Sequence, residues 1–531
     1  MGLIGGLKAP WELLRLQQSE SSACELQQVC PAPDDKGSGK RMLGISEFFV
    51  ALVAFLLIVQ FLKLQWVGRR LPPGPTPLPF IGNLWLLGFK LHPETLEKLA
   101  QIHGKIFTLW LGQSPVIVLH GFQAVKDGLT TNPEDVSGRP AMPFFNEKAT
   151  EKGIVMTSGH TWKQQRRFGL MTLRNLGLGK KGLEHRIQEE ARHLVEYFMN
   201  ERGQPLDPSV FFSQALSNVI CAVVLGHRFS ADDETFQQLL KANACLLISA
   251  GTLRERLHNT FPWLMNHLPG PHKKVLSSHG FLYCFAKEEI RRHEESGVPD
   301  EPQDFIDFYL AQMVKCKDDP TSTFDEGNLI QTILDLFIAG TESTATTLRW
   351  ALISLVLHPH IQEEVQKELD AVLGPSQLIC YEDRKNLPYT NAVIHEIQRY
   401  SCIAPVGVPR QCVKDTTLLG LPVPKGTVIL PNICSVLSDP EQWETPHQFN
   451  PTHFLDKDGN FMSREAFLPF SAGHRVCLGE RLARTELFIF FTSLLRAFTF
   501  RLPEGVTEIN TERILGGLLQ PHHYKICAVP R

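Results

Sequence analysis

The hydrophobic positions of the chain begin with one continuous apolar run. The run from Leu43 to Leu62 is about twenty residues long, which is the length that a helix needs to cross a bilayer core. A buried core helix could have the same composition, but basic residues and a proline break follow this run and favour a membrane anchor. No small-residue cleavage site follows it, so we expect the anchor to be retained.

Further along the chain the apolar positions recur with the spacings of strands and helices. Two short apolar runs, Ile106 to Leu111 and Val116 to Leu119, are broken by Gly112 and Pro115 and predict a β-hairpin. The segments with helical spacing are Leu183 to Asn200, Leu329 to Leu357, His360 to Leu373, Asn391 to Tyr400 and Leu478 to Phe498. The pattern therefore predicts a mainly α fold with a minor β part.

These patterns divide the chain into four predicted parts. Residues 1–41 form a leader of unknown role, 42–63 a transmembrane anchor, 64–79 a proline-rich linker and 80–531 the main domain. The prolines between Leu71 and Pro79 fix φ and remove backbone donors, so the linker is expected to be stiff and non-helical. Basic residues stand on both sides of the anchor, and their count leaves its orientation open.

Charge and cysteine usage narrow the function classes. The net charge of −3 provides no overall field that would attract nucleic acid, so no nucleic-acid partner is expected. The 12 cysteines include no CxxC pair and no regular spacing. This usage indicates a reducing compartment, where a thiol remains available as a metal ligand.

The most specific motif is F-x-x-G-x-R-x-C-x-G, which starts at Phe470. Gly473 permits a tight turn, and Arg475 can pair with an anionic group. Cys477 stands just before a predicted helix, whose free amides stabilise a thiolate. A lone cysteine in such a loop would be read as structural, but the complete pattern resembles the cytochrome P-450 superfamily. The resemblance implies a haem-thiolate fold with haem b as cofactor and Cys477 as ligand of the haem iron.

A second motif is the E-x-x-R pair of Glu396 and Arg399, which lie on one face of a predicted helix. Alone, such a pair is usually a surface ion pair. The element from Asn450 to Phe454 lies between this pair and Cys477, as in the superfamily, where the pair forms a structural clamp near the haem. The family often has arginine where this chain has His453, so the third member of the clamp stays open.

The long apolar helix contains a small pair, Ala339 and Gly340, followed by polar residues. In the family resembled, the small pair lets the helix pass close over the haem, and the next acid and alcohol deliver protons. Here these positions are Glu342 and Ser343, and serine replaces the usual threonine. Thr344 is expected to point roughly 100° away from Ser343. The alternative is that Glu342 and Ser343 form only a polar strip on a core helix.

Further basic residues match the family's propionate-binding positions. They are Trp162 with Arg166, in a W-x-x-x-R pattern, and Arg410 after the E-x-x-R helix. Nearby lysines and arginines could form a docking face for an acidic electron donor, or merely a solvated face. These residues are Lys163, Arg167, Lys180 and Lys181.

Several stretches of the sequence, for example Leu387 to Arg399, resemble the vertebrate microsomal family 2 and most closely its J subfamily. The resemblance implies epoxidation or hydroxylation of arachidonic acid, linoleic acid and xenobiotics. It further implies electrons from NADPH through NADPH-cytochrome P-450 reductase, with cytochrome b5 as an additional donor. The expected location is the endoplasmic reticulum membrane, with the catalytic domain facing the cytosol.

By matching position, the resemblance predicts an apolar substrate pocket. Its walls would be Phe144, Phe145, Leu336, Phe337, Ile338, Ala404, Val406, Leu518 and Leu519. The apolar stretch from Phe261 to Met265 is expected to touch the bilayer. Two other hypotheses stay open, namely a reductase-independent isomerase of lipid peroxides and a non-catalytic haem-binding sensor in the membrane.

Overall fold

The computed structural model describes residues 45–531 except 89–91, 146–150, 178–180, 298 and 375–376. The predicted leader, residues 1–41, therefore lies outside the described residues. The chain divides into two compact units at Phe55, and only the start of α1 (Ile45–Gly68) belongs to the first unit. The rest of α1 and all later elements belong to the second unit.

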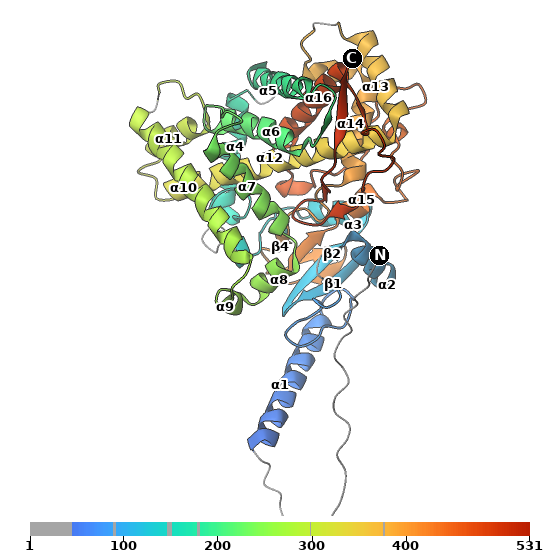
Figure 1. Cartoon of the computed structure of the whole chain (residues 1–531). Coiled ribbons are helices and arrows are strands. Elements are labelled where there is room, and N and C mark those ends of the chain that lie inside the picture. Colours follow the sequence, from blue (N-terminus) through green and yellow to red (C-terminus); the bar gives the residue numbers. More distant parts are fainter. Residues whose placement is uncertain (1–44, 89–91, 146–150, 178–180, 298, 375–376) are drawn as a thin grey trace, which may run out of the picture. The chain divides into compact units, whose positions relative to one another are not determined.

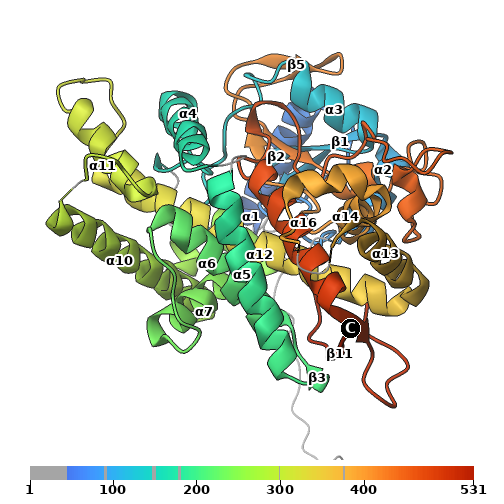
Figure 2. The ribbon, with the colours of Figure 1, turned by 90° about the horizontal axis from the view of Figure 1, so that it is seen from above.

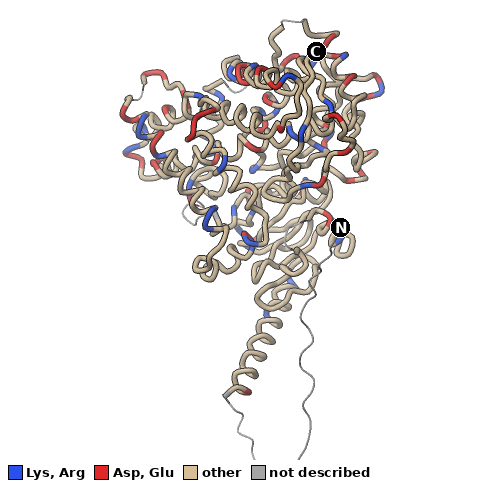
Figure 3. Tube along the Cα trace, viewed as in Figure 1, with Lys and Arg blue, Asp and Glu red and all other residues tan. Residues whose placement is uncertain are grey.

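Helix α1 has the composition of a membrane span. Its stretch Ser46–Gly68 is 23 residues long with a mean hydropathy of 2.2, and Figure 3 shows few charged residues along it. The helix continues five residues beyond the predicted anchor end at residue 63, because Lys63 to Val67 contain no helix breaker. The following prolines form no helix and lie along the sheet edge, where the amide of Thr108 donates to Pro73 O at 2.9 Å.

The second unit is mainly helical (Figure 1), as the sequence predicts. Its helices are α2 (Pro93–His103), α3 (Phe122–Thr130), α4 (Gly159–Asn175), α5 (Lys181–Asn200), α6 (Ser209–Val224), α7 (Glu234–Ser249), α8 (Leu253–Thr260), α9 (Pro262–Met265), α10 (His272–Ser296), α11 (Phe305–Lys315), α12 (Glu326–Leu357), α13 (Pro359–Val372), α14 (Pro388–Ser401), α15 (Ile433–Leu437) and α16 (Glu480–Ala497). Short 3-10 turns are η1 (Pro143–Phe145), η3 (Tyr381–Asn386), η4 (Pro451–Phe454) and η5 (Gly473–Arg475).

The strands form small sheets at the side of this helical body. They are β1 (Ile106–Leu111), β2 (Ser114–Leu119), β3 (Pro205–Leu206), β4 (Arg410–Gln411), β5 (Thr416–Leu418), β6 (Leu421–Val423), β7 (Val428–Pro431), β8 (Phe498–Arg501), β9 (Arg513–Ile514), β10 (Gln520–Pro521) and β11 (Ile526–Pro530). The largest sheet has the order β1-β2-β7-β4. Its β1–β2 pair is antiparallel, with Ile106 opposite Leu119, and confirms the predicted hairpin.

Helix α12 is the central element of the fold. Figures 1 and 2 show it crossing the domain, and it packs against α6, α10, α14 and α16. The carboxylate of Asp325 caps its first turn by accepting from the amide of Asn328 at 2.8 Å. Most of its residues are buried, which explains why its apolar residues are not confined to a single face. The helix thereby holds the residues from Ala339 to Thr344 in the interior of the domain.

Candidate haem-binding site

The loop before α16 holds Cys477 in a fixed turn. Gly473 has a φ of +70°, and a side chain there would place its Cβ 2.1 Å from Leu129 O, so only glycine fits. The amide of Val476 donates to Gly473 O at 3.0 Å, and the amide of Cys477 donates to Phe470 O at 3.0 Å. The motif therefore folds back on itself and places Cys477 three residues before α16.

Cys477 lies deep in the domain, yet its side chain is accessible to solvent. Burial raises the pKa of its thiol, while the amides of Gly479 and Glu480 and the charge of Arg166 act in the opposite direction. A side chain that is both surrounded by protein and accessible faces an internal hollow. The sulfur is thus placed to bind a group that fills this hollow, and the two amides favour the thiolate form that a metal requires.

Four arginines gather beside this loop. Each is anchored by backbone carbonyls: Arg139 Nη1 by Pro409 O at 2.8 Å, Arg166 Nη2 by Val476 O at 2.6 Å, Arg410 Nη2 by Ala472 O at 2.6 Å and Arg475 Nε by Ser137 O at 2.7 Å. Burial and then mutual repulsion lower the pKa of Arg475 to about 8, of Arg139 to about 9 and of Arg410 to about 10. Several cations in one poorly solvated place require an anion.

The charges and donors of this cluster fit haem. Within the described part of the chain, none of the four arginines forms a salt bridge with a carboxylate. Two buried donors, Arg410 Nη1 and Trp162 Nε1, have no acceptor, and the Trp162 ring lies 4.0 Å from the guanidinium of Arg475. A group with two carboxylates and a metal ion would satisfy both the arginines and the thiol. Arg139 was not predicted, because a lone arginine in a loop is ordinarily exposed and nothing in its neighbourhood marks it.

The small residues of α12 have different surroundings from each other. Ala339 is exposed although it belongs to a core helix, so we infer that it faces the internal hollow. At Gly340 the structure gives another reason for a small residue than the predicted groove. A Cβ at Gly340 would lie 2.5 Å from Ile220 Cδ1, so this glycine lets α6 pack closely on α12.

The predicted acid and alcohol point to different neighbours. Glu342 is buried and accepts from Ser213 Oγ of α6 at 2.9 Å, and burial raises its pKa. Ser343 Oγ instead donates to Ala339 O at 2.7 Å. The structure therefore places the two side chains apart. Glu342 can reach Ser343 only through an intervening group.

The hydroxyl of Thr344 has a different hydrogen-bond partner from that of Ser343. Together with Ser343 and Thr347, Thr344 lines a pocket whose opposite wall includes Ala404. Its hydroxyl also donates to Glu486 Oε2 of α16 at 3.0 Å. Burial raises the pKa of Glu486 to about 8, so this acid holds a proton at neutral pH. The contact links α12 to α16, which no local sequence pattern could reveal.

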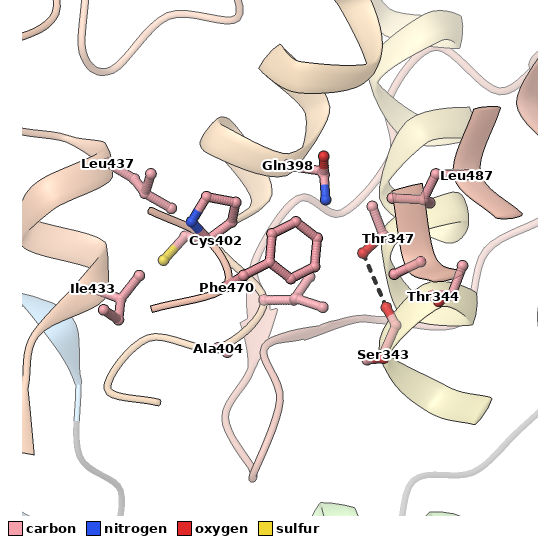
Figure 4. Close-up of a pocket in the computed structure, with 13 residues that line it drawn as sticks. Ser343, Thr344, Thr347, Gln398, Cys402, Ala404, Ile433, Leu437, Phe470 and Leu487 are labelled. Atoms are coloured by element: carbon pink, nitrogen blue, oxygen red, sulfur yellow. Dashed lines mark hydrogen bonds between the residues drawn. The ribbon is translucent and has the colours of Figure 1, made fainter. Parts of the chain in front are cut away.

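Figure 4 shows this pocket between the hydroxyl residues of α12 and the chain that follows α14. Phe470 lies between the two sides, with Ala404 and Cys402 facing Ser343 and Thr344 across it. The structure thus brings three predicted site residues, Ser343, Ala404 and Phe470, into one pocket. Its lining is apolar apart from the α12 hydroxyls and Gln398.

The other predicted wall residues divide by exposure. Leu336, Ile338 and Leu518 are half-buried, as a pocket lining should be. Phe144, Phe337 and Leu519 are almost completely buried and belong to the hydrophobic core. Val406 packs against a separate cluster that includes residues of β1, β2 and β7, and the side chain of Phe145 lies outside the described part of the structure.

The E-x-x-R pair forms a fully buried network. Arg399 donates from Nε and Nη2 to the two carboxylate oxygens of Glu396, at 2.7 Å each. The remaining donors of Arg399 reach the carbonyls of Leu437, Pro446 and Gln448. His453, whose role the sequence left open, occupies the third place, with Nδ1 3.2 Å from Glu396 Oε2 and Nε2 2.9 Å from Thr445 Oγ1.

Comparison with known proteins agrees with this geometry. The cytochrome P450 family model matches residues 72–528. Cytochrome P450 2J2 of Homo sapiens is 46% identical over 479 residues, which cover 90% of this chain and 95% of that protein. Cytochrome P450 2J5 of Mus musculus is 44% identical, with 92% and 97% covered, and cytochrome P450 2C8 of Homo sapiens is 41% identical, with 91% and 100% covered. With this match across nearly its whole length, the chain belongs to the cytochrome P450 family, the haem-thiolate monooxygenases.

Proposed function

We propose that this protein epoxidises or hydroxylates lipophilic substrates, among them polyunsaturated fatty acids such as arachidonic and linoleic acid, and xenobiotics. The observation that carries the proposal is the accessible Cys477 thiol beside a cluster of arginines that lacks an anion. The resemblance to the J subfamily supports the fatty-acid class, and the apolar lining of the pocket beside Ser343 suits such chains.

In this proposal the protein holds haem b through its own side chains. Cys477 would bind the iron, and Arg139, Arg166, Arg410 and Arg475 would pair with the propionates. When bound, the haem supplies activation of dioxygen, so that one oxygen atom enters the substrate and the other leaves as water. The residues of α12 exclude bulk water from this place and present the Ser343 hydroxyl as a proton carrier.

The surface near Arg166 supports the proposed electron donors, NADPH-cytochrome P450 reductase and cytochrome b5. A broad depression there is lined by five basic residues, by Trp162, Leu170 and Met171, and by Glu134, which pairs with Lys163 at 3.2 Å. The basic residues are Lys163, Arg166, Arg167, Arg174 and His474. Such a face suits an acidic protein partner. Of the predicted lysines, Lys180 lies outside the described residues, and only the backbone of Lys181 is described. We further propose residence in the endoplasmic reticulum membrane through α1, with the catalytic domain in the cytosol.

Turnover assays test this function. The full chain, reconstituted with haem and lipid, is incubated with arachidonic acid with or without reductase and NADPH. The proposal expects epoxides and hydroxides only when both are present. Product from lipid hydroperoxides without reductase would instead indicate an isomerase. Haem binding without product from a panel of lipids and drugs would indicate a sensor.

Variants of Arg475 and Arg166 test whether these side chains bind the haem propionates. Replacing either by alanine is expected to weaken haem retention by about tenfold or more, because a charge-assisted hydrogen bond is lost in a poorly solvated place. The measurement is the haem content per folded protein and the rate of haem transfer to apomyoglobin. The exposed Arg254 provides the matched control, since its replacement by alanine should leave both unchanged. Normal retention in both site variants would remove the arginines from this role.

Ser343 tests the proton-carrier assignment. Ser343→Ala should leave haem content and substrate affinity nearly intact but lower the product formed per NADPH several-fold. The remaining reducing equivalents should appear as hydrogen peroxide. Ser343→Thr should raise this ratio, because the added methyl restricts χ1 of the hydroxyl. Both variants and the parent are compared with the same fatty acid. If all three couple alike, proton supply runs through other groups, and Thr344 with its Glu486 partner would be examined next.

A further inference from the structure

The end of α10 and the start of α11 bring one histidine and two aspartates together. His293 lies in the last turn of α10, and Asp304 and Asp307 lie at the N-terminus of α11. One ligand atom of each side chain lies within 4.8 Å of the other two, and we call the three residues the α10–α11 cluster. Figures 1 and 2 show α10 and α11 beside each other at the other end of the domain from α14. The cluster is therefore separate from the haem site.

The hydrogen bonds of His293 leave one ring nitrogen directed at a carboxylate. Nδ1 lies 2.7 Å from Glu289 O, and because a carbonyl oxygen only accepts, Nδ1 carries the proton of this bond. Nε2 lies 3.0 Å from Asp304 Oδ2. An unprotonated Nε2 would turn its lone pair toward a negative oxygen, so a positive charge has to lie between them. That charge is either a second proton on the ring or a metal cation.

The two carboxylates are buried and have few cationic partners. Asp304 is 4% exposed and Asp307 is 6% exposed. Among the residues that the structure describes, His293 is the only basic side chain that pairs with Asp304, and none pairs with Asp307. The amide of Gln303 donates to Asp307 Oδ2 at 3.0 Å, while Asp307 Oδ1 accepts no hydrogen bond from these residues. One protonated imidazole would thus balance only one of two buried negative charges.

Solvent reaches the α10–α11 cluster on its histidine side. The side chain of His293 is 14% exposed, and Ser296 and Gly297, which follow it, are exposed. On the other side Gly226 lies against the cluster, since a Cβ there would be 2.5 Å from Asp304 Oδ2. A metal ion needs little room, because it takes the place of a proton between ligand atoms that are already close together. An ion can therefore enter past His293 and keep water molecules on that side.

We propose that the α10–α11 cluster binds a divalent metal cation through His293 Nε2 and one carboxylate oxygen each from Asp304 and Asp307. A neutral imidazole with two carboxylates suits Mn²⁺ or Zn²⁺, and water would fill the remaining positions. The bond from Nδ1 to Glu289 O is the arrangement that orients metal-binding histidines in proteins. This site does not depend on the proposed function, because Cys477 and its hollow contribute nothing to it.

A bound cation would connect α10 to α11 and, through α11, support α4. Helix α11 packs against α4, and Tyr309 of α11 donates to Gln165 Oε1 of α4 at 2.9 Å. Gln165 precedes Arg166, one of the four arginines at the haem site. The expected role of the ion is therefore structural, since it fixes the helix on which α4 rests.

Binding of Mn²⁺ to the full haem-loaded chain tests the site. Equilibrium dialysis gives the dissociation constant, and pulsed electron paramagnetic resonance detects the nitrogen of a bound imidazole. Asp307→Asn keeps the size of the side chain and an acceptor for the Gln303 amide. It should weaken binding by about tenfold to hundredfold, the loss seen even when only an outer partner of a metal ligand is removed. His293→Gln should weaken binding at least as much and abolish the nitrogen signal.

His193→Gln is the matched control, because His193 also pairs with a carboxylate, that of Glu196 at 3.3 Å, and should bind Mn²⁺ like the parent. Mn²⁺ should also raise the temperature at which the parent loses its helical circular dichroism, but not that of Asp307→Asn. Circular dichroism without metal shows that each variant is folded. If His293 is only a protonated partner of Asp304, the parent will bind neither Mn²⁺ nor Zn²⁺, which would overturn the inference. Binding that survives in folded Asp307→Asn or His293→Gln, or that falls equally in His193→Gln, would show adventitious binding elsewhere and overturn it too.

Discussion

Cys477→His is expected to abolish both monooxygenase activity and the thiolate signature in the absorption spectrum of the reduced carbon monoxide complex. Imidazole donates less charge to iron than thiolate, so it supports neither property. Cys402, which lines the pocket beside Phe470, is buried, and burial raises the pKa of its thiol. The measurement is the spectrum of purified protein after reduction and addition of carbon monoxide, together with turnover of arachidonic acid.

Two further variants make the Cys477 result interpretable. Cys284→Ser removes an exposed thiol on α10 and should keep the signature and the activity of the parent. Cys477→Ser preserves the size of the side chain, so a folded Cys477→Ser protein without the signature separates the loss of ligand from a failure to fold. Circular dichroism reports the fold in each case. Retention of the signature in either Cys477 variant would remove this residue from the ligand position.

The sequence predicts most of what is local. The Cys477 loop and the E-x-x-R pair are contiguous motifs, and apolar periodicity places α5, α12, α13, α14 and α16 with errors of only a few residues at their ends. Helix α14 begins at Pro388, three residues before the predicted start, because proline is tolerated in the first turn. Helix α16 begins at Glu480 rather than Leu478.

Contacts between distant segments could not be predicted in this way. Gly340 is small because Ile220 packs on it from another helix, and Thr344 is held by Glu486 across 142 residues. The importance of Arg139 comes from burial without an anionic partner. The sequence neighbours of an arginine do not show whether its side chain is buried or paired, since most arginines in proteins are exposed.

The second large effect is expected at the buried clamp. Glu396→Ala would leave the Arg399 guanidinium, which is 2% exposed, without its carboxylate. Removing one partner of a buried ion pair costs about 3–5 kcal/mol. The network also ties α14 to the carbonyls of Leu437, Pro446 and Gln448, so its loss should loosen the support of the haem site. We expect low yield of haem-loaded protein and faster loss of the haem spectrum on heating.

Variants of His453 and of a surface ion pair provide a scale for this prediction. His453→Phe keeps the ring but removes the contacts to Glu396 and Thr445, so its cost should be about 1–3 kcal/mol and smaller than that of Glu396→Ala. Glu441→Gln disrupts an exposed pair with Lys105 and should cost under about 1 kcal/mol. The rate of loss of the haem spectrum is compared at one temperature, because unfolding of such a protein is irreversible and its stability is a rate. The order Glu396→Ala fastest, His453→Phe next and Glu441→Gln like the parent follows because the first variant leaves a buried charge unpaired, the second removes buried hydrogen bonds and the third affects only an exposed pair. If Glu396→Ala lost haem no faster than Glu441→Gln, the clamp would contribute nothing to holding the site together, whatever its geometry.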